Sequence, residues 1–248
     1  MRALSPPELL GVWERGLAQG PVERALTLLG AACPETSLDV LTSVSIGQRD
    51  ACLMELREAT FGAALNVYAE CPHCAERLEF VIDAAEVRSC AKATGNSMGD
   101  GESRELATDG FQLRFRLPDS TDLTAAARCG DAVEARRLIL HRCVMEARRG
   151  EVAVTPEELP EPVIAGFASH LAECEPQAEL LIDLECPGCD HRWQAAFDIA
   201  SFLWQEINAL AKHLLQEVAA LARAYGWREA DILAMSAARR EFYLEMVS

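Results

Sequence analysis

The chain has 248 residues, half of them hydrophobic, which is enough to bury the core of one large domain or of two smaller ones. Its 23 basic and 39 acidic residues give a formal net charge of −16, which argues against a nucleic-acid partner because the surface field repels phosphate. No apolar run reaches the roughly 18 residues that cross a bilayer, and the amino terminus lacks the apolar centre of a signal peptide. We therefore expect a cytoplasmic protein without a membrane partner.

The first part of the chain, residues 1–62, has the patterns of several amphipathic helices. Ser5 is a suitable N-cap before Pro6, apolar residues then recur three or four apart, and Gly20 ends the pattern. The segments 21–33 and 45–62 repeat this arrangement. We predict an N-terminal helical region over residues 1–62.

A closely spaced cysteine pair, Cys71-Pro72-His73-Cys74, follows these helices between two strand-like segments, 64–70 and 78–83. The same spacing occurs in the active sites of thiol–disulfide oxidoreductases and in one half of many zinc sites. A redox pair lies at the amino end of a helix, whose terminus lowers the pKa of the first thiol. Because a strand follows the pair here, the metal interpretation is favoured.

The segment after this pair, residues 89–175, is predicted to be an insertion made of a loop, a strand and helices. Residues 89–105 are polar, contain glycine and lack periodicity, which is typical of a flexible loop. Apolar and basic residues alternate over 111–118, which predicts a strand. Helices are expected at about 121–148 and 157–174.

A second cysteine pair, Cys186-Pro187-Gly188-Cys189, lies 115 residues after the first and repeats its surroundings. Residues 70–87 and 185–202 are identical at seven of eighteen positions. Strand-like segments also flank this pair, at 179–185 and 193–198. Each unit is thus a strand, a Cys-Pro-x-Cys turn and a second strand, which is the form of a zinc knuckle.

Two such knuckles supply the four thiolates of a closed tetrahedral zinc site. A full shell leaves no position for water or substrate, so the expected zinc is structural rather than catalytic. The alternative is a pair of hairpins that bind no metal. The predicted ligands are Cys71, Cys74, Cys186 and Cys189.

The two knuckles are expected to form a small β zinc ribbon from residues 63–88 and 176–200. His73 and His191 lie beside the ligands, and we expect both to be exposed turn residues outside the shell. The remaining cysteines are scattered singly and are expected to behave as small hydrophobic residues: Cys33, Cys52, Cys90, Cys129, Cys143 and Cys174.

The end of the chain, residues 201–248, is predicted to be a C-terminal helical module. Apolar residues three or four apart predict one amphipathic helix of about 25 residues that Gly226 ends, followed by two short helices. Large aromatic residues gather beyond that glycine, a composition typical of interface anchors. The candidate partner-binding residues are Trp227, Phe242 and Tyr243.

The sequence contains no phosphate-binding glycine loop, no Gly-x-Ser-x-Gly elbow and no His-Glu-x-x-His motif. We therefore predict no catalytic residues and expect a protein that is not an enzyme. The fold class predicted is α+β and mainly helical, with N-terminal, inserted and C-terminal helices around the zinc ribbon.

Several segments together resemble the baseplate hub assembly chaperone family of contractile-tailed phages and extracellular contractile injection systems. They are LLGVWERGLAQGPVERALTLL, SIGQRDACLMELREATFG, the two knuckles, FRLPDSTDL, WQAAFDIASFLWQEI and LARAYGWREADILAMSAARREFYLEMV. The paired knuckles indicate a zinc-ribbon-bearing branch of this family. The resemblance implies a non-enzymatic factor or component that binds baseplate hub or wedge proteins in the cytoplasm.

Two other functions remain open at this stage. A nucleic-acid-binding zinc-ribbon protein needs basic residues near the knuckles, whereas Glu70, Glu76, Glu185 and Asp190 make their surroundings acidic. A CxxC oxidoreductase is opposed by the strands that follow both cysteine pairs.

Overall fold

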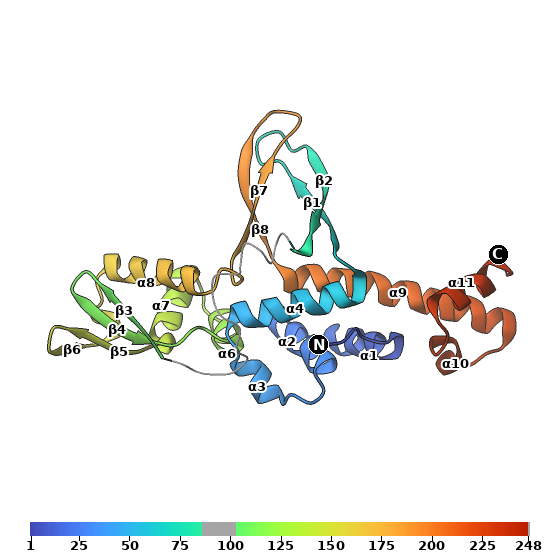
Figure 1. Cartoon of the computed structure of the whole chain (residues 1–248), viewed down its shortest axis with the longest axis horizontal. Coiled ribbons are helices and arrows are strands. Elements are labelled where there is room, and N and C mark those ends of the chain that lie inside the picture. The colour runs from blue at the N-terminus through green and yellow to red at the C-terminus, as the bar shows by residue number, and fades with distance from the viewer. Residues whose placement is uncertain (86–102, 248) are drawn as a thin grey trace.

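The computed structural model describes residues 1–85 and 103–247. Its parts are a helical body, two hairpins that rise from one side of the body, and a smaller mixed unit beside it (Figure 1). The chain is therefore a mixed helical and strand protein with small antiparallel sheets. Within the described ranges, no helix is both long and apolar enough to cross a membrane.

Four helices build the body, and the apolar residues along them form one continuous core. In the longest helix, Leu203, Ile207 and Leu221 recur on one face and are fully buried. That helix ends at Gly226, whose φ of 71° is a left-handed conformation that glycine adopts at little cost, as predicted. The four helices are α1 (Pro6–Gly16), α2 (Pro21–Ala32), α4 (Ile46–Phe61) and α9 (Ile199–Tyr225).

Within the described residues, three shorter helices complete the body. The sequence did not predict α3 (Leu38–Ser43), which connects α2 to α4. The two predicted C-terminal helices, α10 (Glu229–Leu233) and α11 (Ala237–Glu245), pack back on α9. Ile232 is fully buried, and the buried Arg240 donates from Nε to Glu217 Oε2 over 2.7 Å.

The two hairpins are antiparallel, and each forms its own two-stranded sheet. In both, exposed residues alternate with half-buried ones from the base almost to the tip, as the alternating sequence predicted. Leu65 at the base of the first hairpin is fully buried against the helical core. The paired strands are β1 (Ala64–Glu70) with β2 (Arg77–Asp83), and β7 (Leu180–Glu185) with β8 (Arg192–Phe197).

The inserted segment forms a four-stranded antiparallel sheet with its own helices and its own apolar core. Phe115 and Val163 are fully buried in this core, and the Phe115 ring meets the Phe167 ring edge to face at 5.1 Å. The strands, in sheet order, are β3 (Arg104–Thr108), β4 (Phe111–Phe115), β5 (Val144–Arg149) and β6 (Val152–Val154). The helices are α6 (Ser120–Ala126), α7 (Ala132–Cys143), the short 3₁₀ helix η1 (Pro156–Glu158) and α8 (Glu161–Cys174).

The helix predicted over 121–148 is wrong, because this segment forms α6, α7 and then β5. Asp131 starts a separate helix by accepting a hydrogen bond from the Glu134 amide at 2.8 Å. Val144 and Ala147 are buried when β5 pairs with β4, and this pairing outweighs the helical preference of the segment.

Other boundaries in the insertion also differ from the prediction. The predicted strand 111–118 ends at Phe115, and the predicted helix 157–174 begins at Glu161 after η1. Most of the predicted loop 89–105 lies outside the described residues, but Arg104 and Glu105 already belong to β3. These two residues pair with Phe115 and Arg114 of β4, and the local sequence pattern did not predict this pairing.

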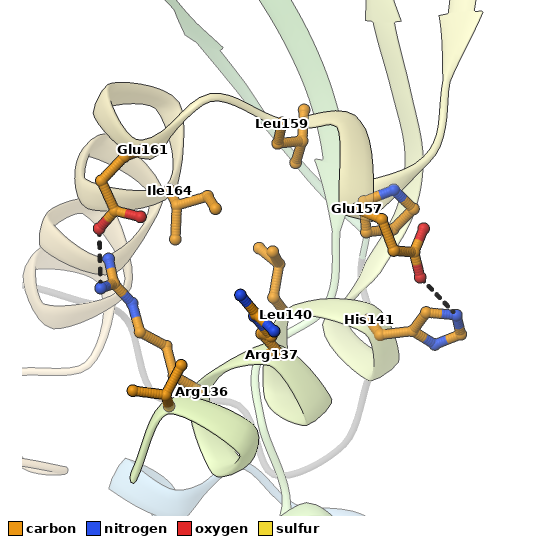
Figure 2. A pocket seen from close by; sticks show the side chains of 10 residues that line it. Arg136, Arg137, Leu140, His141, Glu157, Leu159, Glu161 and Ile164 are labelled. Carbon is orange, nitrogen blue, oxygen red and sulfur yellow. Dashed lines mark ion pairs between the residues drawn. The ribbon is translucent and has the colours of Figure 1, made fainter.

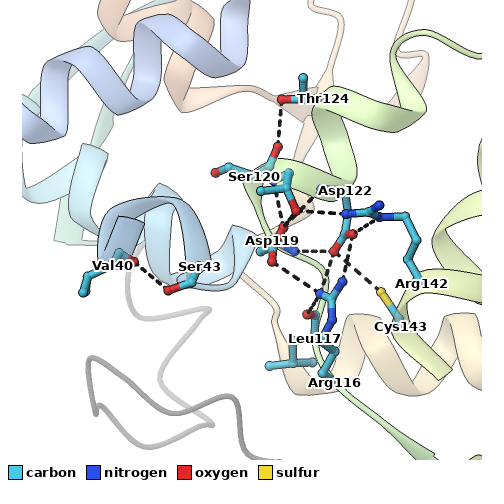
Figure 3. A network of polar contacts seen from close by, with 11 residues as sticks. Val40, Ser43, Arg116, Leu117, Asp119, Ser120, Asp122, Thr124, Arg142 and Cys143 are labelled. Carbon is cyan, nitrogen blue, oxygen red and sulfur yellow. Dashed lines mark hydrogen bonds and ion pairs between the residues drawn. The ribbon is translucent and has the colours of Figure 1, made fainter. Parts of the chain in front are cut away.

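A buried carboxylate in α6 joins the segment before this helix to α7 within the inserted unit (Figure 3). Asp122 is fully buried and accepts hydrogen bonds from both Nη atoms of Arg116, at 2.7 and 2.9 Å, and from Arg142 Nε at 2.5 Å. Burial opposes ionisation of Asp122, but the two arginines and the Asp119 amide outweigh it and lower the pKa of this carboxyl to about 2. Beside this network, the Ile46 amide donates to the Pro118 carbonyl, which links the unit to α4.

Candidate metal centre

The four predicted ligands lie at the tips of the two hairpins, in two turns of the same geometry. In the first turn, the Cys71 amide donates to the Glu76 carbonyl and the Ala75 amide donates to the Cys71 carbonyl, both at 2.9 Å. In the second turn, the Cys186 amide donates to the His191 carbonyl at 2.9 Å, and the Asp190 amide donates to the Cys186 carbonyl at 2.8 Å. Each bond in one turn has a counterpart 115 residues away, so the sequence repeat is also a structural repeat.

The residue after the second cysteine of each turn has a left-handed backbone conformation. The φ angle is 59° at Ala75 and 56° at Asp190. This conformation costs an L-residue about 1–2 kcal/mol, although aspartate adopts it more readily than alanine. Sequence reasoning missed this feature because neither position is a glycine.

The hairpin tips bring all four sulfur atoms together, each within 4.8 Å of the others. The Sγ atoms of Cys71 and Cys189 are 3.7 Å apart, and those of Cys74 and Cys186 are 3.5 Å apart. Four sulfurs placed tetrahedrally at about 2.3 Å from a central ion would lie about 3.8 Å from one another. The arrangement therefore fits a four-thiolate metal site.

The thiols of this cluster differ in how readily they ionise. Burial opposes ionisation of Cys71, but bonds from the Cys74 and His73 amides outweigh it and lower the pKa of the Cys71 thiol to about 7. The His191 amide also favours the thiolate at Cys189, yet burial and the neighbouring thiols raise the pKa of that thiol to about 12. Four thiolates at this separation repel one another, so a cation is needed to hold all four ionised.

The histidines beside the ligands stack on each other outside the cluster. The rings of His73 and His191 are 5.5 Å apart, and Trp193 continues the stack at 6.0 Å from His191. His73 is exposed as expected, whereas His191 is half-buried between its two neighbours. In the described part of the chain, the group of side chains that can hold a metal consists of the four cysteines without either histidine.

The position of the cysteines does not resemble a redox site. β2 follows Cys74 and β8 follows Cys189, so neither pair is placed at the amino end of a helix. Elsewhere, burial is the main cause that raises the pKa of Cys52 to about 11 and that of Cys143 to about 12, which makes these thiols unreactive. Cys90 lies outside the described residues.

The three predicted partner-binding residues lie in one aromatic cluster at the end of the chain. The Trp227 ring stacks on Tyr225 at 4.3 Å and meets the Tyr243 ring at 4.9 Å. Trp227 and Tyr243 are half-buried and pack against the helical core, whereas Phe242 is 60% exposed. Phe242 is therefore the exposed ring of a cluster whose Trp227 and Tyr243 rings also stabilise the body.

The fold and the site define a mainly helical protein with small antiparallel sheets and a four-cysteine cluster. The chain belongs to the family described as T4 bacteriophage base plate protein, which matches residues 18–204, well over half of its length. Comparison with curated proteins gives no significant match, and comparison with solved structures gives none either. The family indicates a phage baseplate-related structural or assembly role, with other baseplate proteins as partners.

The matched range includes both cysteine pairs and the whole inserted unit. It ends in the second turn of α9, so α10, α11 and the aromatic cluster lie beyond it. The C-terminal segment quoted above for the family resemblance is therefore not part of the match.

Proposed function

We propose that this protein is a non-enzymatic assembly factor or component of a phage-like baseplate in a contractile injection system, of the hub assembly chaperone type. It acts in the cytoplasm by binding hub or wedge proteins. The observation that carries the proposal is the family match over most of the chain. No observation favours nucleic-acid binding or thiol oxidoreduction as a second candidate function.

We further propose that the four-cysteine cluster binds one structural zinc ion. The support is the tetrahedral spacing of the sulfurs and the chemistry of four thiolates, which is typical of closed zinc sites. Bound zinc would supply a cross-link between residues 63–88 and 176–200, the two halves of the proposed ribbon. Residues 89–175 would then form an insertion whose two ends meet near the metal site. The separate apolar core of this insertion agrees with such an arrangement.

The zinc proposal is tested by metal analysis together with X-ray absorption of the purified protein. One zinc per chain with four sulfur neighbours at about 2.3 Å is expected. A preparation without metal that keeps both hairpins ordered would contradict it. The zinc-loaded protein is also expected to show no turnover in an insulin-reduction assay, since its thiols are held on the metal.

We propose the exposed face of the aromatic cluster as the partner contact, with Phe242 as its centre and Trp227 and Tyr243 as its support. An aromatic ring at the centre of an interface typically contributes about 2 kcal/mol of binding free energy. Because Phe242 is exposed, its loss should change binding much more than folding.

The assembly role is tested by co-expressing the protein with candidate hub and wedge proteins from the same gene cluster and measuring co-purification. Phe242→Ala is expected to weaken association by about 2 kcal/mol while thermal unfolding stays unchanged. Met145→Ala, which truncates another exposed apolar side chain in the inserted unit, is the matched control. If the wild-type chain binds no baseplate protein, the assembly role is wrong. If Phe242→Ala binds normally, the contact lies on another surface.

A further inference from the structure

The inserted unit meets the helical body where α6 lies against α2 and α3, and the two apolar cores do not merge there. At this seam the Ile46 amide donates to the Pro118 carbonyl at 3.0 Å, and Ser45 pairs with Asp119 as an isolated β-bridge. A cavity of about 370 Å³ also lies between the parts, lined by Ile46 of the body and Leu123 of the inserted unit. Polar and incompletely packed contacts between two units of one chain permit the units to move relative to each other.

Glu175, the residue that follows α8, reaches across this seam to the start of α4. It is only 7% exposed, and its Oε1 accepts a hydrogen bond from the hydroxyl of Ser45, the N-cap residue of α4. A carboxylate is stabilised there because the amino end of a helix carries a partial positive charge. Gly47 leaves the space for it, since a Cβ atom at this position would lie 3.0 Å from Glu175 Oε1 and 3.1 Å from Glu175 Cβ. The end of the inserted unit is thus docked on the first turn of α4.

This contact also has an unfavourable side, because the second oxygen of Glu175 is left unsatisfied. Oε2 is buried and makes no hydrogen bond with any residue that the structure describes. Burial raises the pKa of Glu175 above its usual value, although the Ser45 hydroxyl and the Gly47 amide favour the ionised form. When Glu175 leaves α4, Oε2 regains water, and Ser45 still caps the helix by accepting from the Gln48 amide at 3.4 Å. Docking therefore gains the helix terminus and loses the hydration of Oε2, so the two arrangements compete.

The inserted unit is expected to move as one body with Glu175. The helix α8, which ends just before Glu175, faces α7 in Figure 2, and Arg136 Nη1 on α7 pairs with Glu161 Oε1 on α8 at 2.9 Å. Phe167 on α8 shares the apolar core of the unit with Phe115 on β4. A displacement at the end of α8 is therefore transmitted to the sheet.

The chain beyond Glu175 is anchored separately. The Ala178 amide donates to the Glu175 carbonyl at 2.9 Å, which makes a turn between α8 and the second hairpin. Leu180 and Phe197 at the base of this hairpin pack against the core of the helical body. Residues 175–179 therefore connect a hairpin that is fixed to the body with a unit whose orientation depends on Glu175.

We propose that Glu175 is a latch that fixes the orientation of the inserted unit relative to the helical body. With its carboxylate docked at Ser45 and Gly47, the unit is held at the seam. When the carboxylate leaves α4, the unit turns about residues 175–179 while the second hairpin stays in place, which gives the chain two orientations of the unit. The proposal rests on neither the zinc site nor the contact at Phe242.

The test measures the distance between the two parts in the full-length protein by double electron–electron resonance. Spin labels are attached to p-acetylphenylalanine, so that the native cysteines stay unmodified. One pair of labels replaces Leu17 of the body and Val133 of the inserted unit. A reference pair replaces Val133 and Val152, which both belong to the inserted unit, and all three side chains are exposed.

Two variants release the latch from opposite sides. Glu175→Ala removes the carboxylate, and Gly47→Ala keeps it but fills the space that it occupies. The charge-matched control is Glu173→Ala, because this side chain is exposed on the same helix. We expect both release variants to broaden the distance distribution between body and unit at least about twofold, while the reference distribution stays as in the wild type. Glu173→Ala should leave both distributions unchanged.

The proposal is overturned if neither release variant broadens the distribution between body and unit, or if Glu173→Ala broadens it equally. It is also overturned if the reference distribution broadens in both release variants, since the unit then unfolds rather than moves. Circular dichroism verifies that Glu175→Ala folds. Should this variant unfold, Gly47→Ala decides by the same criteria, because alanine is otherwise favourable in a helix.

Discussion

The two hairpins and the inserted unit are both built from short antiparallel strands, but they are held together in different ways. In the inserted unit, helices cover the sheet, and large side chains such as Phe115 and Val163 are fully buried. Within the strands and turns of the described hairpins, the buried residues are Leu65 at the base and Cys71 and Cys186 at the tips. A two-stranded hairpin is marginally stable in water by itself. We therefore expect the cysteine cluster, with its proposed metal, to stabilise the hairpins as the apolar core stabilises the inserted unit.

The largest expected effect comes from removing the proposed structural zinc. Structural zinc contributes about 10–16 kcal/mol to the folding of zinc-finger peptides, so Cys186→Ser or chelation should disorder the hairpins while the inserted unit stays folded. Hydrogen exchange of the two sets of amides, with zinc content measured in parallel, compares the two regions directly. Cys129→Ser is the control, because this cysteine lies outside the cluster. Unchanged protection of the hairpin amides in the metal-free protein would show that the metal does not stabilise the hairpins.

The reverse experiment targets the inserted unit. Asp122→Ala leaves Arg116 and Arg142 without their carboxylate, and because both arginines are partly exposed and can be solvated, a loss of about 2–3 kcal/mol is expected. We expect the amides of the inserted unit to lose protection while the zinc content is retained. Glu146→Ala breaks the exposed pair with Arg114 and should change stability by less than about 1 kcal/mol. A joint loss of zinc and of order in the inserted unit would show that the two regions unfold together.

The hairpins and the inserted unit should lose stability at different pH values when the protein is acidified. The pKa of Asp122 is about 2 in the folded protein and about 3.9 in an unfolded chain, so the folded state binds fewer protons over this range. Its contribution, about 2 kcal/mol, is fully present above pH 4 and is lost as the pH falls from about 4 to about 2. Thiolate ligands take up protons at higher pH, so zinc should leave first. A pH titration that follows zinc release and far-ultraviolet circular dichroism checks this order.

The smallest effect concerns the two turns of the cysteine cluster, which differ in the residue that adopts the left-handed conformation. Ala75→Gly removes a strain of about 1–2 kcal/mol but adds freedom to the unfolded chain, so a net stabilisation of about 0.5–1 kcal/mol is expected. Asp190→Gly should stabilise less, because aspartate tolerates this conformation better. Thermal unfolding of the zinc-loaded variants measures both changes. Equal gains would mean that the two turns carry equal strain.

The sequence predicted the features that depend on local pattern or on repetition. The apolar face of α9 and the end of this helix at Gly226 follow from the side-chain period. The strands around both cysteine pairs follow from the internal repeat. It did not predict β5, because Val144 and Ala147 become buried only when β4 is present beside them.

Because the chain is synthesised from its N-terminus, the insertion delays the formation of the cysteine cluster. Cys71 and Cys74 leave the ribosome well before Cys186, since 115 residues separate the two turns. At about 5–20 residues per second, the first half-site waits about 6–23 s for the second. The last helix of the inserted unit, α8, ends at Cys174, so the whole unit with its own core leaves the ribosome before Cys186 does. Closure of the cluster therefore requires that α1 to α4, both hairpin tips and the inserted unit have left the ribosome.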